Sequence, residues 1–430
     1  MVYPRSDGEC VTVLSIDGGG VQGIVPAVLL KYLETQLKEL EKQNGGSPND
    51  VRIADYFDVV GGTGTGSLMA AMLTKPSKLQ AERPQYDMAD IIASLREISR
   101  DTFSDEDEQN IIERTVNLAF GAFGLFTSTV RTFLDPNKKI WSIVDEFWER
   151  NWEADICPFQ EFDTKLRNKL QNIRLDQTLS DVVVPAFHFD STRPVVFSTS
   201  QAKKLREHNN EDVTLRDVVL SSSATPTVFP FHSFKYCGKF ARFADGSVVA
   251  NNPTLLALTE GARLYGSGPN YKNYLVLSLG TIRRRAPPND IWAVPSVIID
   301  YISKRIWKGI KARVLQYMYI LFGDIMEMYM TQIVPSQLHE GRLNYLRVQG
   351  FEPNNLVPSI VDGSTTGFEE LKRIAFKILK NHATVVDPNT GAHAKQNYTN
   401  EEALTFFARQ LHTERQRRLL NSNNHMCKNI

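Results

Sequence analysis

The sequence predicts an α/β fold, and three turns that contain glycine carry this prediction. Two of them join an apolar run rich in β-branched residues to an apolar run with helical spacing, over residues 11–34 and 53–73. The third lies around Asp245 and precedes a predicted helix over residues 254–265. Strand, turn and helix in succession form the repeating unit of α/β proteins. The chain has 430 residues, of which 42% are hydrophobic, so it can bury a core.

The first unit consists of a strand over residues 11–16, the turn Asp17 to Gly23, and a helix that starts at Ile24. Consecutive glycines allow several backbone N–H groups to point at one spot, and the helix start adds positive potential. This turn is therefore suited to an anion or a developing oxyanion. The GxGxxG spacing also allows a dinucleotide site, but that site needs an acidic residue at the end of the second strand. The second strand instead ends on another glycine turn.

The second unit contains Gly62-Thr63-Gly64-Thr65-Gly66, which has the flanks of a nucleophile elbow, GxSxG, with glycine in the serine position. In such an elbow the outer glycines, here Gly62 and Gly66, let the strand and the helix pack closely. The central side chain projects above the edge of the sheet. Thr63, Thr65 and Ser67 stand beside the bend, but the elbow directs only its central residue toward a catalytic partner. The expected hydroxyl at residue 64 is therefore missing.

The third turn runs through Asp245-Gly246-Ser247 to Asn252-Pro253. Asn252 and Pro253 suit the N-cap and the first position of the helix over 254–265, which places Asp245 on the loop just before that helix. An isolated Asp-Gly pair is typical of a simple turn. Its place after the two glycine turns gives this one a second interpretation.

The three turns, in this order, resemble the patatin-like phospholipases, and most closely the plant branch of that family. The resemblance continues through four further segments, residues 175–185, 222–230, 277–281 and 344–349. It implies a three-layer α/β/α fold with a mixed, mainly parallel central sheet. We expect one patatin-like domain over residues 10–385, with an enlarged helical insertion or cap at 85–165, and a polar C-terminal tail at 386–430.

The resemblance also implies a catalytic Ser-Asp dyad that acts on acyl esters of phospholipids and galactolipids, a carboxylic ester hydrolase of the phospholipase A type. Such a dyad requires neither a cofactor nor a metal. Carried over by position, Asp245 is the dyad base and Gly64 stands where the nucleophile should be. The oxyanion hole then falls to Gly18, Gly19, Gly20 and Gly23.

Two further positions depart from the family pattern: Gln22 replaces an arginine, and Ser247 replaces glycine or alanine. The change at Gly64 outweighs both, because loss of the nucleophile alone costs a serine hydrolase on the order of a million-fold in rate. Some plant members of the family also carry GxGxG and are still grouped with the lipid acyl hydrolases. We therefore expect a lipid acyl hydrolase whose turnover is weak or lost. The alternative is a catalytically inactive lipid-binding, storage or defence-related protein with the hydrolase fold.

A water in the gap at residue 64 offers an unconventional route, because Asp245 would activate it directly as a general base. The eight histidines lack the i, i+4 spacing of a helical metal site. A triad through His232 would still have no serine.

Charge and hydropathy indicate a cytoplasmic protein whose membrane contact, if it occurs, is peripheral. Basic and acidic residues balance at 49 each, so we expect no nucleic acid partner. The first nine residues lack the apolar core of a signal peptide, no run reaches the ~20 apolar residues of a spanning helix, and the four cysteines lack metal-ligand spacing, so we expect a cytosolic protein. Two segments are candidates for membrane contact: the apolar patch at 118–126 and a basic amphipathic stretch at 301–323. Alternatively, residues 118–126 are packed core, and residues 301–323 form a helix that packs on the domain with its basic face in solvent.

Overall fold

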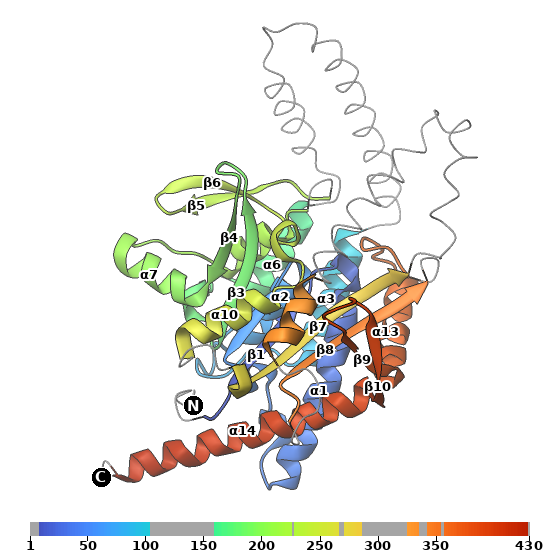
Figure 1. The fold of residues 1–430 in the computed structure, drawn as a ribbon. Helices are drawn as coiled ribbons and strands as arrows, with labels where there is room; N and C mark the ends of the chain where they lie inside the picture. The colour runs from blue at the N-terminus through green and yellow to red at the C-terminus, as the bar shows by residue number, and fades with distance from the viewer. Residues whose placement is uncertain are drawn as a thin grey trace, which may run out of the picture.

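The computed structural model describes residues 8–103, 159–225, 228–265, 271–285, 325–334, 342–353 and 357–428; of residues 284, 285, 353 and 422–428 it describes the backbone alone. Within them, a central sheet is covered by helices on both faces (Figure 1). The predicted α/β class and the three-layer arrangement are therefore confirmed. The expected insertion lies mostly outside these ranges, as do the apolar patch at 118–126 and the basic stretch at 301–323.

Seven strands of the eight-stranded sheet have the order β5-β6-β3-β2-β1-β7-β8. The eighth strand, β4, pairs with residues 183–188 of β3. Neighbours from β3 to β8 run parallel, whereas β4, β5 and β6 add antiparallel pairs, so the sheet is mixed and mainly parallel at its centre. The strands are β1 (Val11–Ile16), β2 (Val59–Gly62), β3 (Asp181–His188), β4 (Arg193–Ser198), β5 (His232–Tyr236), β6 (Lys239–Ala244), β7 (Tyr274–Arg285) and β8 (Tyr345–Pro353).

Side chains alternate between the two faces of the sheet, as the pleat of a strand requires. In β1, Leu14 and Ile16 join the larger core cluster, while Val13 joins the smaller one on the opposite face. Because the central strands are buried on both faces, they are apolar at nearly every position. This explains why the apolar residues of 11–16 do not alternate strictly with polar ones, and why Thr12 and Ser15 in this strand are buried as well.

The larger cluster packs helices from along the chain against one face of the sheet. These are α1 (Ile24–Gln43), α2 (Thr65–Thr74), α3 (Met88–Thr102), α6 (Phe159–Leu170), α8 (Leu215–Ser223), α13 (Thr365–Lys380) and α14 (Asn400–Lys428). The opposite face is covered by α10 (Thr254–Tyr265) and by the helical segment 325–333. Helix α7 (Thr199–Asn209) follows β4, and the short α9 (Ser247–Ala250) follows β6. Short 3-10 turns form at η2 (Gly20–Gly23), η3 (Pro48–Asp50), η4 (Ile53–Tyr56), η5 (Leu175–Gln177) and η6 (Tyr271–Asn273).

The segment predicted as a polar tail is built into the fold. A small hairpin of β9 (His382–Val386) and β10 (His393–Thr399) leads into the long helix α14, which crosses the base of the molecule in Figure 1. Buried residues repeat along α14 at i, i+3, i+4 and i+7, namely Leu404, Phe407, Ala408 and Leu411. Many charged residues mask this stripe in the composition, although its spacing is readable in the sequence.

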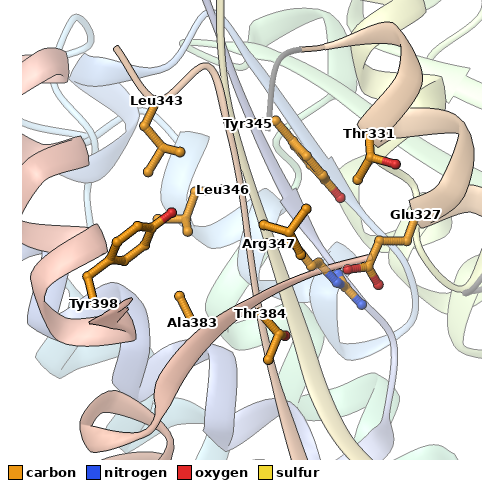
Figure 2. A pocket seen from close by; sticks show the side chains of 10 residues that line it. Glu327, Thr331, Leu343, Tyr345, Leu346, Arg347, Ala383, Thr384 and Tyr398 are labelled. Carbon is orange, nitrogen blue, oxygen red and sulfur yellow. The ribbon is translucent and has the colours of Figure 1, made fainter. Parts of the chain in front are cut away.

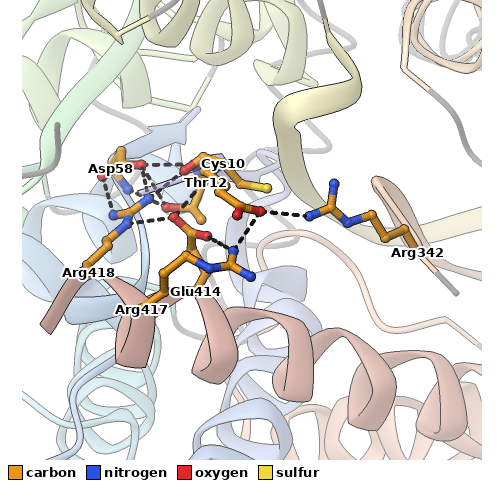
Figure 3. A network of polar contacts seen from close by, with 8 residues as sticks. Cys10, Thr12, Asp58, Arg342, Glu414, Arg417 and Arg418 are labelled. Atoms are coloured by element: carbon orange, nitrogen blue, oxygen red, sulfur yellow. Dashed lines mark hydrogen bonds and ion pairs between the residues drawn. The ribbon is translucent and has the colours of Figure 1, made fainter. Parts of the chain in front are cut away.

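A buried ionic network fastens α14 to the start of the sheet (Figure 3). Arg418 donates to both carboxylate oxygens of Asp58, at 2.8 and 2.9 Å, and to the backbone oxygen of Cys10 at 2.6 Å. Its Nε also donates to Glu414 at 3.0 Å, one helical turn earlier. The C-terminal helix is thereby tied to the residue before β1 and to the residue before β2. No helix in the described ranges is both long enough and apolar enough to cross a bilayer.

Candidate functional site

The three predicted turns meet at one edge of the sheet. Strands β1 and β2 are parallel neighbours, and Ile16 and Gly62 at their carboxyl ends are paired in register. The turns that follow these strands therefore leave the sheet side by side, and Thr63 N–H donates to the backbone oxygen of Ile16 at 3.2 Å. Such an edge, beyond the carboxyl ends of parallel strands, is the usual location of ligand sites in open α/β sheets.

Gly64 has the backbone of a nucleophile elbow. Its φ of +53° and ψ of −119° lie in a region that residues with a side chain rarely adopt. A Cβ atom placed there would have Gly18 Cα and the Ser222 backbone oxygen as its nearest neighbours, both at 3.8 Å. The position therefore has room for a side chain that the chain does not supply.

The outer glycines of the elbow permit the close packing that the sequence predicts. A Cβ on Gly62 would lie 2.2 Å from the backbone oxygen of Gly66, and a Cβ on Gly66 would lie 2.2 Å from the backbone oxygen of Ile16. Both clashes are with backbone atoms, so only glycine fits at either position without moving the strand or the helix.

The three hydroxyls beside the bend are engaged with backbone carbonyls. Thr63 donates to Ala250 at 2.7 Å, Thr65 to Gly20 at 2.7 Å, and Ser67 to Gly64 at 2.6 Å. Each hydroxyl has a single proton, so in this arrangement none of them offers it to Asp245. They hold the elbow against the neighbouring turns.

The glycine turn after β1 leaves two backbone donors unused within the described residues. Gly18 N–H donates to the Asn251 oxygen at 3.2 Å, whereas the N–H groups of Gly19 and Gly20 donate to no described partner. Gly20 has a φ of +56°, which favours glycine. Gly23 faces inward, since a Cβ there would lie 2.5 Å from Thr65 Cγ2. Gly19 and Gly20 are thus the members of the predicted oxyanion set with free N–H groups in this part of the chain.

Gln22, which replaces the family's arginine, is buried and serves a structural contact. Its side-chain amide donates to the backbone oxygen of Pro358 at 2.9 Å. The neighbouring Val21 N–H donates to the backbone oxygen of Ile360 at 2.8 Å. These bonds fix the glycine turn to the loop that follows β8.

Asp17 is anchored by Arg347 from β8. Arg347 Nη1 and Nη2 donate to the two oxygens of Asp17, at 2.9 and 2.6 Å, and Nη1 also donates to Ser278 Oγ of β7 at 2.8 Å. Burial raises the pKa of Asp17, and the guanidinium opposes that increase. The ion pair therefore crosses β7 and fixes the start of the glycine turn.

Arg347 also borders a small pocket beneath the site. Glu327 lies near its guanidinium and Tyr345 stands on the adjacent wall (Figure 2). The cavity has a volume of about 10 Å³, close to the requirement of one water. It is far too small for an acyl chain, so this pocket is not a lipid site.

Asp245 follows β6 directly and is 3% exposed. Its Oδ1 accepts from Ser247 N–H at 2.8 Å, and its Oδ2 accepts from Thr225 Oγ1 at 2.8 Å. Burial raises the pKa of this carboxyl, and the hydrogen bonds from Ser247 and Thr225 oppose the increase. The short helix α9 separates Asp245 from α10, so the loop predicted here is partly helical.

Ser222 joins the Asp245 turn to the elbow. Its Oγ accepts from Gly64 N–H at 3.1 Å, and its backbone oxygen accepts from Gly246 N–H at 3.1 Å. The same backbone oxygen is one of the two atoms nearest to the vacant Cβ position of Gly64. One residue at the end of α8 thus contacts both Gly64 of the elbow and Gly246, the residue after Asp245.

Ser222, Thr225 and Arg347 were not predicted as site residues, although all three lie in segments that carry the family resemblance. The sequence could have indicated a buried ion pair for Arg347, because a single charged residue inside an apolar strand implies a buried partner. Nothing in the sequence indicated the roles of Ser222 and Thr225, because their hydrogen-bond partners lie on other turns of the chain.

His232 pairs with Asp217 at 2.8 Å and so has a structural partner. Among the described residues, no three His, Cys, Asp or Glu side chains are placed to hold a metal ion.

Comparison with known proteins agrees with this arrangement. The family model described as patatin-like phospholipase matches residues 14–258, which contain all three turns. Patatin-like protein 2 of Oryza sativa subsp. indica is 30% identical over 434 residues, covering 95% of this chain and 94% of the relative. Patatin-like protein 3 of Arabidopsis thaliana is 29% identical, with coverage of 96% and 92%. Probable inactive patatin-3-Kuras 1 of Solanum tuberosum is 32% identical, with coverage of 64% and 63%. The chain belongs to the patatin-like phospholipase family.

Proposed function

We propose that this protein binds acyl esters of phospholipids or galactolipids at the Gly64 and Asp245 site, and that its hydrolysis of them is weak or absent. The observation that carries the proposal is the elbow itself. Gly64 has the backbone conformation and the free space of a nucleophile position, but it bears no hydroxyl. The turn geometry that supports the proposal is therefore present without an attacking atom.

The remaining groups suit the other steps of acyl transfer. The N–H groups of Gly19 and Gly20 are suited to stabilise the charge that develops on the ester oxygen, because preorganised donors act strongly where water is excluded. The carboxylate of Asp245 would accept the proton of the attacking group and return it to the leaving alcohol. With no hydroxyl at residue 64, a water in the gap is the remaining nucleophile for direct general-base hydrolysis. We expect this route to be slow, because a free water is less well positioned than a bound side chain.

The test compares wild type, Gly64→Ser and Gly64→Ala on a p-nitrophenyl acyl ester and on phosphatidylcholine. Both variants add a Cβ in the same strained backbone, so Gly64→Ala controls for strain and crowding. We expect Gly64→Ser to exceed both other proteins by about a hundredfold or more, since nucleophile loss costs far more than that in a serine hydrolase. If Gly64→Ser were no faster than Gly64→Ala while remaining folded, the site would not be an incomplete hydrolase site.

Residual wild-type hydrolysis is checked by a separate substitution. If water attacks with help from Asp245, then Asp245→Asn abolishes the rate while the protein stays folded. An esterase rate that survives Asp245→Asn would place the hydrolysis elsewhere or in a contaminant.

A silent lipid-binding, storage or defence-related protein is the second candidate. The relative from Solanum tuberosum named as a probable inactive patatin favours it, because that name attaches inactivity to a similar chain. Two measurements together separate the candidates: binding of a fluorescent, non-hydrolysable acyl-ester analogue, and hydrolysis of phosphatidylcholine. Binding of the analogue with no hydrolysis of phosphatidylcholine supports the silent protein. Peripheral membrane contact is part of either proposal, and pelleting with liposomes that contain or lack anionic lipid tests it.

A further inference from the structure

We propose that Thr225, assisted by Ser247, caps the carboxylate of Asp245 and occupies the hydrogen-bonding position that a nucleophilic hydroxyl would use. Thr225 is then a positioning residue that satisfies the buried carboxylate and makes it less basic than burial alone would, in a chain without a serine at residue 64. The inference rests on the proposed function, since it assigns the base of that site to Asp245.

The Thr225 hydroxyl has two acceptors within reach and one proton to give. Its Oγ1 lies 2.8 Å from Asp245 Oδ2 and 3.3 Å from the backbone oxygen of Ser223. The shorter contact is also the one to a carboxylate, and hydrogen bonds to charged acceptors are the stronger ones. The proton therefore goes to Asp245.

The backbone around Thr225 holds this hydroxyl in place. Thr225 N–H donates to the Ser223 oxygen at 2.7 Å, and the Thr225 oxygen accepts from the N–H groups of Val228 and Phe229, both at 3.0 Å. Asp245 N–H donates to the oxygen of Ala224, the preceding residue, at 3.0 Å. Base and cap are thus joined through both backbone and side chain, which fixes their relative position.

Ser247 satisfies the other carboxylate oxygen. Its N–H donates to Oδ1 at 2.8 Å, and its side chain is also hydrogen-bonded to Asp245. Glycine or alanine, the usual residues of the family pattern at this position, would supply the N–H but not the hydroxyl. This chain therefore combines a hydroxyl lost at residue 64 with hydroxyl donors around the base.

The cap changes what Asp245 can do. The carboxylate is 3% exposed, and in the described part of the chain hydroxyl and amide donors, not charged side chains, act on its pKa. Donors to the ionised form stabilise it and lower its tendency to take a proton. A general base must take a proton in the transition state, so each such donor reduces its driving force. Restoring serine at residue 64 therefore gives back the nucleophile but leaves the base capped.

The experiment measures kcat and KM against pH for Gly64→Ser alone and combined with Thr225→Val or Thr225→Ser. Valine keeps the shape of threonine without the hydroxyl, and serine keeps the hydroxyl. We expect Thr225→Val to raise kcat by about tenfold, the rate equivalent of one hydrogen bond to a charged group, with KM unchanged. The acid limb of the profile should move to higher pH, because the base loses a donor. Thr225→Ser should bring both quantities back to those of Gly64→Ser alone.

Two outcomes overturn the proposal. If Thr225→Val lowers the rate of Gly64→Ser to that of Gly64→Ala, Thr225 is needed for catalysis rather than restraining it. If the rate changes while the acid limb stays in place, Thr225 acts by packing and not through the carboxylate.

A readout without catalysis keeps the cap testable even if Gly64→Ser is inactive and the proposed function fails. Unfolding in urea is followed at acid and alkaline pH for wild type, Thr225→Val and Thr225→Ser. Without the Thr225 donor, the ionised carboxylate is less well satisfied, so Thr225→Val should cost more stability at pH 8 than at pH 4, where the carboxyl is closer to its neutral form. The stability of Thr225→Ser should remain close to that of wild type at both pH values. A cost that does not vary with pH would refute the cap.

Discussion

Arg347 and Asp17, 330 positions apart in the chain, form a two-point ion pair across the sheet, with contacts of 2.9 and 2.6 Å between buried side chains. Arg347→Met would leave the Asp17 carboxylate without its cation in the core, which typically costs about 3–5 kcal/mol. We expect the double variant Asp17→Asn with Arg347→Met to lose much less than the sum of the single losses. Urea unfolding of the three variants measures this coupling.

Acid pH should reduce the cost of Arg347→Met. Burial already raises the pKa of Asp17, and the guanidinium that opposes this effect is gone in the variant. The carboxyl is then neutralised earlier as the pH falls, which removes the buried charge. Arg342→Met is the matched control, because the exposed pair of Arg342 and Glu9, at 3.5 Å, should contribute less than about 1 kcal/mol. If Arg347→Met and Arg342→Met lost the same free energy of unfolding, the buried ion pair would contribute no more to stability than the exposed one.

Alanine substitutions at the three glycines of the elbow should lower the free energy of unfolding by different amounts. At Gly64 a Cβ has space but an unfavourable backbone, so Gly64→Ala should cost about 1–3 kcal/mol. At Gly62 and Gly66 a Cβ would lie 2.2 Å from a backbone oxygen, so these variants should lose more than about 4 kcal/mol or fail to fold. Soluble yield and thermal unfolding report the order, and a Gly64→Ala protein less stable than Gly62→Ala would contradict it.

The sequence predicted the local units of this fold well, because each is bounded by glycine and a change of hydrophobic period. Strand β1 spans Val11–Ile16 and helix α10 spans Thr254–Tyr265, as predicted. A glycine turn has a local cause, so it can be read from neighbouring residues.

Contacts between distant segments could not be read in the same way. Nothing near Thr225 in the sequence indicates that its hydroxyl bonds Asp245, 20 positions later, and nothing near Ser222 indicates the elbow 158 positions earlier. These contacts follow from strand order and helix packing, which place the end of α8 beside the turns after β2 and β6. The polar tail at 386–430 was misjudged for another reason: its overall composition is polar, while the apolar stripe of α14 is narrow.

Arg418 and Arg417 are adjacent on α14 and offer a matched comparison of buried and exposed ion pairs. The Arg418 side chain is 10% exposed and is bonded to Asp58, Glu414 and the Cys10 oxygen, whereas the Arg417 side chain is 35% exposed. We expect Arg418→Ala to cost about 3–5 kcal/mol, because it removes the guanidinium that binds both oxygens of the buried Asp58 carboxylate. Arg417→Ala should cost less than about 1 kcal/mol. Urea unfolding measures both, and similar values would mean that the network in Figure 3 does not hold the C-terminal helix.

Lys75, at the end of α2, should make stability depend on alkaline pH. Its side chain is fully buried, and Nζ donates to Gln85 Oε1 at 2.7 Å. Burial, with a smaller contribution from Lys78, lowers the pKa of Lys75 from 10.5 to about 8. Between these values the unfolded chain binds the proton and the folded protein does not, so this residue makes stability rise with pH, by up to roughly 1.4 kcal/mol per pH unit.

Lys75→Met removes this pH-dependent gain. The stability of wild type relative to Lys75→Met should therefore increase between pH 8 and pH 10.5 and stay constant below that interval. Other groups that titrate in the same range are shared by both proteins and cancel in the difference. Lys42→Met, at an exposed position, is the control and should show a flat difference. If Lys75→Met were equally flat, the amine would be charged in the folded protein throughout, and water or an acidic partner would have to reach it.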